Sequence, residues 1–407
     1  MIMSCQLPEM PTRIAIVGAG VGGLMLAASL GENYQIDLFE HRSSLNGDGY
    51  GLNIQPNAIS ELAGLGLLSR LCSVGIQTRA HRYLSSDGQQ IMEEPRGRFA
   101  GEVMPQLSIL RRDLVSTLLS RLPSSCQIHT RDSVAIEDLE RWERQSRKPY
   151  DLIAGADGIN SVTRSYTVGP TALRDGGMTL YRGVADLPKM LDGETFILVT
   201  ADNGCRLIAY PVSATIAKVG SSRINWVLLV PDSVTVGKSA ALGNSQEAVR
   251  RKLRSLIGNW ALGFLDVAAM IEKSPIIKSD RLRDRDPIDQ WSRSRVVLLG
   301  DAAHPMYPIG AQGASQTIVD AACLAGAIKT KADPFDAITE FVSTRLPQTN
   351  KIVLANRKMN REELEHLGTT GSARFKKFHK TTSNYRQAVR DRPRPRSSWV
   401  GEDTIER

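Results

Sequence analysis

Short glycine- and aspartate-rich motifs in this 407-residue sequence have the residue types and spacing that a dinucleotide cofactor requires. The first, Gly18-Ala-Gly20-Val-Gly-Gly23, matches the pattern G-x-G-x-x-G. Gly18 permits a tight turn, Gly20 lets the backbone approach a pyrophosphate, and Gly23 lets a helix lie close to a strand. Glu40 follows about 20 residues later, at the spacing of a carboxylate that binds ribose hydroxyls. The motif predicts a dinucleotide site, but it does not decide between FAD and NAD.

The motif that favours FAD is Gly300-Asp301-Ala-Ala-His304, followed by the loop Pro308-Ile-Gly310-Ala-Gln-Gly313. It comes after the segment 295–299, whose last four residues are apolar and predict a buried strand. Open α/β sheets bind ligands at the carboxyl ends of their strands. Asp301 could accept a hydrogen bond from a sugar-like hydroxyl group. A helix that begins near Gly313 would direct its N-terminus at the part of a flavin that gains negative charge on reduction, an interaction worth about 0.3–1 kcal/mol.

A third motif, Asp157-Gly158 with Ser161 and Arg164 after it, follows another predicted strand and indicates a sharp turn. This turn could serve the same cofactor, or Asp157 could be only a turn residue. His304 is expected to be structural rather than catalytic, because no metal-ligating partner lies near it in the sequence.

The elements around these motifs predict an α/β fold in which a sheet is inserted into a discontinuous domain. Strands at 13–18 and 36–40, with a helix between them, form a βαβ unit whose strands are parallel and whose crossover is right-handed. Four strand-like runs between 179 and 230 indicate a second, mainly antiparallel sheet, and 313–367 has helical character. Further predicted elements are helices over 57–71 and 112–122 and a β-hairpin over 83–92. The predicted domains are a Rossmann-type FAD-binding domain (13–80, 106–170 and 290–370), a β-sheet substrate domain (81–105 and 171–289) and a partly disordered C-terminal tail (371–407).

The overall composition argues against several other classes of protein. The formal net charge is +8, but the basic residues are scattered and do not form the stripe that nucleic-acid binding needs. The five cysteines form no C-x-x-C pair, so neither a zinc site nor a disulfide framework is supported, and reduced thiols fit a cytoplasmic protein. The longest apolar run, 14–30, holds four glycines in a patterned loop, which does not fit a membrane helix. We therefore expect no metal, no nucleic-acid partner and no membrane contact, and the oligomeric state stays open.

Taken in chain order, the motifs Gly18/Gly20/Gly23, Asp157-Gly158 and Gly300-Asp301 resemble those of the single-component flavoprotein hydroxylases typified by para-hydroxybenzoate and salicylate hydroxylase. The resemblance covers roughly residues 13–370, and within the family the sequence is most similar to the phenazine-modifying monooxygenases, on Gly49–Pro56, Tyr181–Val184 and Asp284–Pro287. It implies an FAD-dependent monooxygenase that uses NADPH or NADH and O₂ to hydroxylate a small aromatic or electron-rich ring through a flavin C4a-hydroperoxide. The sequence has no second G-x-G-x-x-G, so NAD(P)H would bind only transiently.

The resemblance also implies roles in cofactor binding. Glu40 would hold the adenosine ribose, and Arg111 would bind near the FAD diphosphate or ribityl chain, although it could instead only begin a surface helix. Asp301 would bind the ribityl chain, and Ala314 would meet the isoalloxazine through its backbone. The full predicted set is Gly18, Gly20, Gly23, Glu40, Gly51, Arg111, Asp157, Asp301, Gly310, Gly313 and Ala314, with the turn at Asp157 serving FAD and NAD(P)H together. The family usually has Asn where this sequence has Ser315, so the role of that side chain is left open.

Two residues of the predicted sheet are candidates for catalysis. Arg182 shares a strand face with Leu180 and Val184, and Tyr210 shares one with Ile208. An arginine can stabilise an aryl oxide or a carboxylate, and a tyrosine can relay or donate a proton. In the phenol hydroxylases that the sequence resembles, an arginine and a tyrosine of this sheet help to form and hold the phenolate. The alternative is a surface-facing arginine and a tyrosine that only packs within the sheet.

Three other functions compete with this hypothesis. A flavin-dependent halogenase would need W-x-W-x-I-P, and the segment around Trp226 lacks the second tryptophan. A plain Rossmann dehydrogenase has no need of a ribityl site at Asp301. A non-catalytic binding module of the same fold would have lost flavin chemistry, whereas all three cofactor motifs are intact here. The sequence leaves open the substrate, the choice of NADH or NADPH, and the choice between hydroxylation, decarboxylative hydroxylation and ring expansion.

Overall fold

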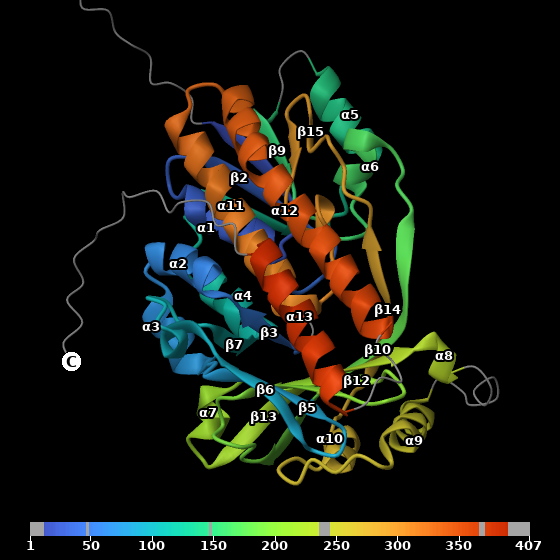
Figure 1. The fold of residues 1–407 in the computed structure, drawn as a ribbon. Helices are drawn as coiled ribbons and strands as arrows, with labels where there is room; N and C mark the ends of the chain where they lie inside the picture. Colours follow the sequence, from blue (N-terminus) through green and yellow to red (C-terminus); the bar gives the residue numbers. More distant parts are fainter. Residues whose placement is uncertain (1–11, 46–48, 146–148, 236–244, 366–370, 390–407) are drawn as a thin grey trace, which may run out of the picture.

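The computed structural model describes residues 12–45, 49–145, 149–235, 245–365 and 371–389. In the view of Figure 1 a six-stranded sheet lies above a seven-stranded sheet, and the C-terminal helices lie in front of both. The first sheet is mainly parallel and the second mainly antiparallel, so the predicted fold class is confirmed.

The six-stranded sheet carries the predicted βαβ unit, in which helix α1 (Val21–Leu30) connects two parallel strands. The strands, in chain order, are β1 (Arg13–Val17), β2 (Gln35–Glu40), β8 (Cys126–Thr130), β9 (Leu152–Gly155), β15 (Ser292–Arg293) and β16 (Val296–Leu298). Their order across the sheet is β15-β16-β9-β1-β2-β8, and all neighbours are parallel except β15 and β16. Strands β1, β9 and β16 come from separate parts of the chain but are parallel neighbours, so their carboxyl ends lie at the same edge of the sheet. The motifs that follow these three strands therefore lie close together.

The seven-stranded sheet has the order β14-β10-β13-β12-β11-β5-β6. Its strands are β5 (Ala80–Ser85), β6 (Gln90–Pro95), β10 (Leu173–Pro188), β11 (Phe196–Thr200), β12 (Arg206–Pro211), β13 (Ser221–Pro231) and β14 (Lys278–Arg285). The pair β11–β5 is parallel and the other neighbours are antiparallel, including the predicted hairpin of β5 and β6. The edge strand β14 was not predicted, because Leu282 is the only apolar residue in its sequence KSDRLRDR.

A small sheet and several short helices surround these two sheets. The small sheet consists of β3 (Gly51–Ile54), β4 (Ile76–Gln77) and β7 (Leu107–Leu110). The predicted helix over 57–71 is wrong in one respect, since α2 (Pro56–Gly64) and α3 (Leu68–Val74) are separated at Gly66, whose φ is +74°. The remaining helices before residue 300 are α4 (Arg111–Leu119), α5 (Ile136–Arg144), α6 (Val162–Val168), α7 (Ala214–Ala217), α8 (Asp232–Thr235), α9 (Gln246–Ile257) and α10 (Val267–Glu272), with the 3₁₀ turn η1 (Gly97–Ala100).

After β16 the chain forms the 3₁₀ turns η2 (Gly300–Ala302) and η3 (Ile309–Ala311) and then three helices. The helices are α11 (Gly313–Thr330), α12 (Pro334–Glu365) and α13 (Gly371–Val389). Within the region predicted as a partly disordered tail, the structure therefore contains a helix. Its Tyr385 is buried and packs against the η3 loop. Residues 390–407, with the Arg-Pro run, lie outside the described residues.

The two faces of the seven-stranded sheet have different neighbours. The outer face, with Tyr181 and Trp226, packs against α9 and α10. The inner face looks toward the η3 loop, α12 and α13. Residues of the inner face are Leu180 and Arg182 of β10, Val227 and Leu229 of β13, and Ile208 and Tyr210 of β12.

Two arginines fasten α12 to the inner side of this sheet. Arg206 of β12 donates from Nη2 to Asn360 Oδ1 at 2.7 Å and from Nη1 to the Glu363 carboxylate. In the opposite direction, Arg357 of α12 donates to Asp284 Oδ2 at 2.6 Å and to Asp286 Oδ1 at 2.7 Å. Only 11% of the Arg206 side chain and 13% of the Glu363 side chain are exposed. Each nearly buried charge therefore needs the other, because an unpaired charge at this depth would destabilise the fold.

Replacing Arg206 with Met should leave the nearly buried Glu363 without its cation and lower the free energy of unfolding by about 3–5 kcal/mol. Urea denaturation measures this quantity. The double variant Arg206→Met, Glu363→Gln should recover much of the loss. Arg254→Ala, which breaks a half-exposed ion pair between α9 and Glu272 of α10, should cost less than about 1 kcal/mol. Equal stability of Arg206→Met and the wild type would show that this pair does not hold α12.

Candidate active site

The turn between β1 and α1 has the shape that the first motif predicts. Gly18 has φ +102°, and a Cβ there would lie 2.5 Å from the carbonyl oxygen of Ala156. A Cβ at Gly23 would overlap the carbonyl oxygen of Gly18. Gly20 is the N-cap of α1 and has no side chain that could cap the helix. The helix end can therefore receive an anion, as a dinucleotide turn requires.

The Gly300–Asp301 loop lies directly beside this turn. A Cβ at Gly22 would lie 2.7 Å from Thr317 Cγ2 and 2.8 Å from Leu299 Cδ1, and a Cβ at Gly300 would lie 2.8 Å from the same threonine. The two loops thus meet over one side chain of α11, with no room for a methyl group on either backbone. This adjacency agrees with the expectation that both motifs serve one ligand.

Asp301 and Arg111 bring opposite charges to this place. Asp301 reaches solvent but is closely surrounded by protein atoms. This partial loss of hydration raises the pKa of its carboxyl group, although the positive charges of His304 and Arg111 oppose the shift. Arg111 begins α4, and its Nη2 lies 3.7 Å from the position of a Cβ on Gly20. A guanidinium beside the glycine turn and a carboxylate next to it suit a diphosphate and a polyol chain respectively.

Glu40 ends β2 and is buried against the same turn. Its Oε2 accepts a hydrogen bond from Ala19 N at 3.1 Å, and its Oε1 accepts one from Arg42 N at 3.0 Å and lies 2.9 Å from His41 Nδ1. The carboxylate therefore holds the loop in shape. Because Oε2 retains a second lone pair, it can also accept a ribose hydroxyl.

The Asp157 carboxylate forms hydrogen bonds within the chain, and its predicted contact with a cofactor stays a prediction. It accepts from Ser161 Oγ at 2.6 Å, Thr163 Oγ1 at 2.5 Å, Val162 N at 2.7 Å and Thr163 N at 3.1 Å. These four bonds close the N-terminus of α6. The backbone of Ala156 and Asp157 lies against Gly18, so the Asp157–Gly158 turn is packed on the glycine motif.

Arg164, to which the sequence assigned no role, ties two motifs together. The side chain is buried and donates to Ala302 O at 3.0 Å, to Ala303 O at 2.7 Å and to Asp286 O at 3.0 Å. Burial lowers the pKa of its guanidinium to about 10, which leaves it charged at neutral pH. Carbonyl dipoles therefore solvate this cation, and the helix after Asp157 is fixed to the loop after Asp301.

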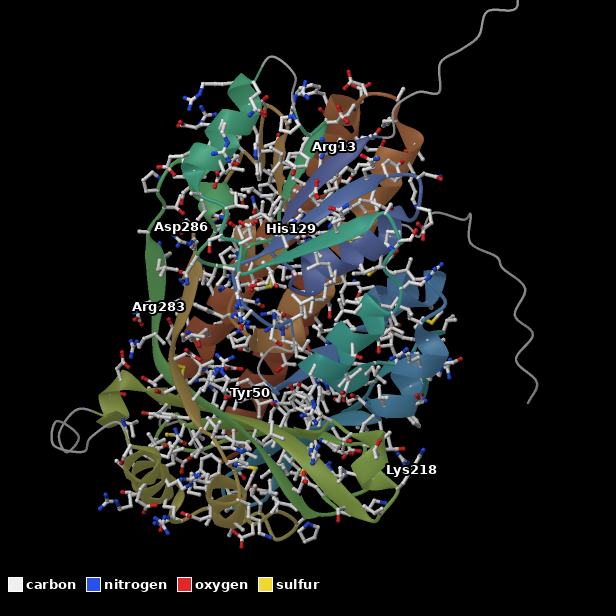
Figure 2. All side chains as sticks on the ribbon, turned by 180° about the vertical axis from the view of Figure 1, so that it is seen from behind. Arg13, Tyr50, His129, Lys218, Arg283 and Asp286 are labelled. Atoms are coloured by element: carbon white, nitrogen blue, oxygen red, sulfur yellow. The ribbon has the colours of Figure 1, made fainter. Side chains whose placement is uncertain are left out.

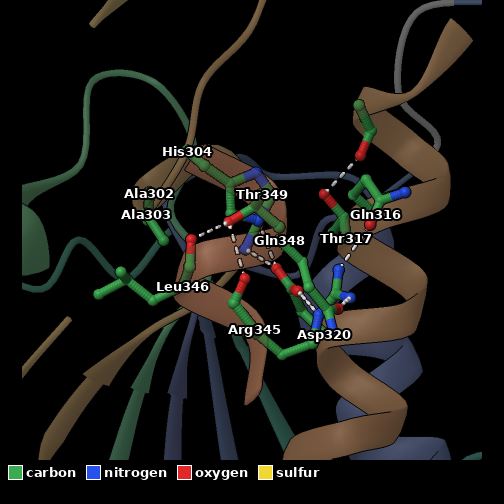
Figure 3. Close-up of polar contacts among 12 residues, drawn as sticks. Ala302, Ala303, His304, Gln316, Thr317, Asp320, Arg345, Leu346, Gln348 and Thr349 are labelled. Atoms are coloured by element: carbon green, nitrogen blue, oxygen red, sulfur yellow. Dashed lines mark hydrogen bonds and ion pairs between the residues drawn. The ribbon is translucent and has the colours of Figure 1, made fainter. Parts of the chain in front are cut away.

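A buried cluster of charges supports the same loop from behind (Figure 3). Asp320 of α11 accepts from Gly300 N at 3.0 Å and lies 2.5 Å from His304 Nε2, while Arg345 Nε of α12 donates to its other oxygen at 2.7 Å. Burial alone would raise the pKa of Asp320, but the charges and hydrogen bonds of His304 and Arg345 hold it below the usual value. His304 is thus a structural partner of Asp320, in keeping with the sequence prediction.

The start of α11 is held by its own contacts. Gly310 has φ +69°, and the ring of Tyr385 lies so close that no side chain would fit there. The Tyr385 hydroxyl donates to Ile309 O at 3.2 Å. Ser315 Oγ accepts from Gln55 N at 3.0 Å, which gives the unusual serine a role in joining α11 to the segment before α2. Gly313 and Ala314 then present the first turn of α11.

On the inner face, Arg182 and Tyr210 point to the same side of the sheet, two strands apart. Between them Val227 and Ile208 are only half-buried, although they face the interior. Tyr210 is buried and stacks on Phe196 with ring centroids 4.6 Å apart. Burial raises the pKa of the Tyr210 hydroxyl, and Arg182 and a hydrogen bond with Asn225 offset this only in part.

Gly51 links the cofactor side to this sheet. Its N–H donates to Asn225 Oδ1 at 2.7 Å, and a Cβ would lie 2.7 Å from the side chains of Asn225 and Val212. The observed contacts of Gly51 are thus with the sheet, and its predicted contact with a cofactor stays a prediction. Because Asn225 also bonds Tyr210, the backbone before α2 and the tyrosine are mechanically connected.

The described residues contain no cluster of His, Cys, Asp or Glu that could hold a metal ion. In the same residues, every helix is too short or too polar to cross a membrane. The groups that do converge are the N-termini of α1 and α11, the Arg111 guanidinium and the carboxylates of Glu40 and Asp301. The helix end of α1 and the guanidinium suit the diphosphate of FAD, and the carboxylates suit its sugar-like hydroxyl groups.

Comparison with known proteins gives concordant results. A family model described as an FAD binding domain matches residues 11–333. The chain is 34% identical to the phenazine 1,6-dicarboxylic acid hydroxylase PhzS of Lysobacter antibioticus, with 93% of this chain and 97% of that protein covered. It is 31% identical to a 3-amino-4-hydroxybenzoate 2-monooxygenase of Streptomyces cremeus, with 86% and 87% covered. The structure of Klebsiella pneumoniae HpxO with FAD and uric acid has a TM-score of 0.70 and 21% identity, over 93% and 92% of the two chains, which is a likeness of fold.

Replacing Asp320 with Asn should weaken FAD binding about 10- to 100-fold, because the loop that carries Asp301 loses charged hydrogen bonds behind it. The dissociation constant is measured by quenching of flavin fluorescence on the deflavinated protein. Asp336→Asn, at an exposed position of α12, is the matched control and should leave the constant unchanged. An Asp320→Asn protein that binds FAD as tightly as the wild type would contradict a positioning role for the cluster.

Proposed function

The chain belongs to the family of FAD-dependent aromatic hydroxylases, and we propose that it acts on a carboxylated aromatic ring that binds against the inner face of the seven-stranded sheet. Its activity is that of an FAD-dependent monooxygenase, not that of a halogenase, a plain dehydrogenase or a binding module. The observation that supports the substrate class is a cation, Arg182, at one end of a half-buried apolar strip. Both relatives named above act, by their names, on aromatic acids.

The residues proposed to hold FAD follow the length of that molecule. The α1 turn with Gly18, Gly20 and Gly23 would receive the diphosphate, together with Arg111. Glu40 would bind the adenosine ribose and Asp301 the ribityl chain. The first turn of α11, from Gly313 to Ala314, would face the isoalloxazine, and Gly310 keeps the preceding loop compact. Bound FAD supplies oxygen activation with electrons from NAD(P)H, and these side chains supply position and charge.

Substrate binding is proposed for the strip that Leu198, Ile208 and Val227 form across neighbouring strands. Apolar side chains would hold the ring, and Arg182 would bind its carboxylate or aryl oxide. Tyr210 keeps its proton at neutral pH, since burial only raises the pKa of its hydroxyl further, and it can donate a hydrogen bond to a ring substituent. The buried stack with Phe196 fixes the tyrosine ring, so the hydroxyl has a defined direction.

The proposal is tested by a panel of aromatic acids, including 3-amino-4-hydroxybenzoate and phenazine 1,6-dicarboxylic acid, with neutral phenols and N-heteroaromatics for comparison. Purified protein should contain FAD, and at least one acid should stimulate NAD(P)H oxidation and yield a product heavier by one oxygen atom. Stimulation by neutral rings alone would overturn the proposed substrate class. Stimulation that yields only hydrogen peroxide would show that the compound is not a substrate.

Two variants test the proposed catalytic residues on the acid selected by the panel. Arg182→Ala should raise KM about 10- to 100-fold, since a charged hydrogen bond is worth about 1.5–3 kcal/mol. Tyr210→Phe should lower the product formed per NAD(P)H consumed and change KM little. Arg254→Ala, on α9 at the outer face, is the control. Unchanged KM and coupling in both variants would exclude the two residues from the reaction.

A further inference from the structure

A second cation lies next to Arg182 on the edge strand of the sheet. Arg182 of β10 and Lys278 of β14 are register partners, so both side chains stand on the inner face. The Arg182 guanidinium carbon and the Lys278 ammonium each lie 5.7 Å from the ring centroid of Tyr50. One aromatic ring therefore contacts both cations.

Tyr50 is held in place by its backbone. Its carbonyl oxygen accepts from Arg111 N at 2.8 Å, and the following residue, Gly51, donates to Asn225 of β13. Figure 2 shows Tyr50 between the six-stranded sheet and the seven-stranded sheet. The ring thus stands where the cofactor side of the molecule meets the edge of the inner face.

Asp280 provides a carboxylate at this place. It lies two residues after Lys278 on the same face of β14, and its Oδ2 is 2.9 Å from Arg182 Nη2. The Asp280 side chain is 54% exposed and that of Arg182 is 36% exposed. An ion pair this accessible contributes only about 0–1 kcal/mol, so Arg182 can exchange it for another carboxylate at little cost.

Two like charges directly opposite each other on antiparallel strands repel. A carboxylate placed between Arg182 and Lys278 is attracted to both cations. A neutral amide forms weaker hydrogen bonds with each of them. The arrangement therefore discriminates by charge, in addition to any discrimination by the shape of the ring.

We propose that Lys278 is a specificity-determining residue that, with Arg182, binds the carboxylate of the aromatic substrate beside Tyr50, and that Asp280 occupies this position on Arg182 until the substrate displaces it. This inference rests on the proposed function, since it assigns a second cation to the same substrate. Tyr50 keeps the two cations side by side through contacts with both.

The chain offers a matched control, Lys252, on the outer face of the seven-stranded sheet. Lys252 of α9 lies 5.4 Å from the ring centroid of Tyr181, which neighbours Arg182 and faces outward. Lys252→Gln therefore removes a lysine–tyrosine contact of the same kind, away from the inner face.

The test compares 3-amino-4-hydroxybenzoate with 3-amino-4-hydroxybenzamide in holoenzyme, by NAD(P)H oxidation and product formed. Lys278→Gln should lower the ratio of kcat/KM for acid over amide about tenfold, mainly through KM for the acid. Lys252→Gln should leave the ratio unchanged. Asp280→Asn should lower KM for the acid, because the competing carboxylate is gone, and this variant tests the proposal even where Lys278→Gln fails to fold.

The outcomes separate this inference from the function on which it rests. An acid that stimulates the wild type, together with unchanged acid-to-amide ratios in Lys278→Gln and Asp280→Asn, overturns the role of Lys278 alone. Equal losses for acid and amide in Lys278→Gln indicate a merely structural lysine and overturn it too. A wild-type enzyme that no aromatic acid stimulates overturns both proposals.

Discussion

Two loop backbones pack closely on one threonine side chain, Thr317, at the edge of the six-stranded sheet, and the site depends on this contact. Gly22 of the α1 turn and Gly300 of the loop after β16 both lie against Thr317, at distances that exclude even a methyl group. The open end of α1 and the Asp301 carboxylate consequently share one small region. A long ligand with a diphosphate and a polyol chain can bridge them, which a single loop could not achieve.

Buried charges behind the loops maintain this arrangement. Arg164 donates to the carbonyl groups after Asp301, and Asp320, between His304 and Arg345, accepts from the backbone before it. Such charges destabilise a fold unless they are paired or solvated by dipoles, and here each one has partners. Their specific geometry fixes the loop that carries Asp301. On the inner face of the second sheet Val227 and Ile208 are only half-buried, and this is where the proposed substrate would bind.

The sequence predicted what depends on local sterics. The glycine turn, the βαβ unit and the strand before Gly300 follow from residue types that few other conformations tolerate. Partnerships formed by tertiary packing were missed. Asp320 is the only acidic residue of α11 and lies between apolar neighbours, a signal of a buried partner, but Arg345 is supplied by another helix. The charged strand β14 has no apolar alternation and exists because β10 pairs with it, so the proximity of Lys278 to Tyr50 could not be inferred. The helix predicted over 57–71 is two helices, and Gly66, a residue type that readily adopts the positive φ seen there, was the sign in the sequence that it is interrupted.

In the proposed arrangement, the cofactor loops and the inner face of the seven-stranded sheet hold flavin and aromatic acid next to each other. The most direct measurement is the flavin absorbance difference spectrum of the holoenzyme, titrated with the acid that best stimulates NAD(P)H oxidation. We expect a saturable change in the flavin bands with one acid bound per FAD, because the ring would lie beside the isoalloxazine. An acid that binds by calorimetry and leaves the flavin spectrum unchanged would contradict it, since the substrate would then lie away from the cofactor.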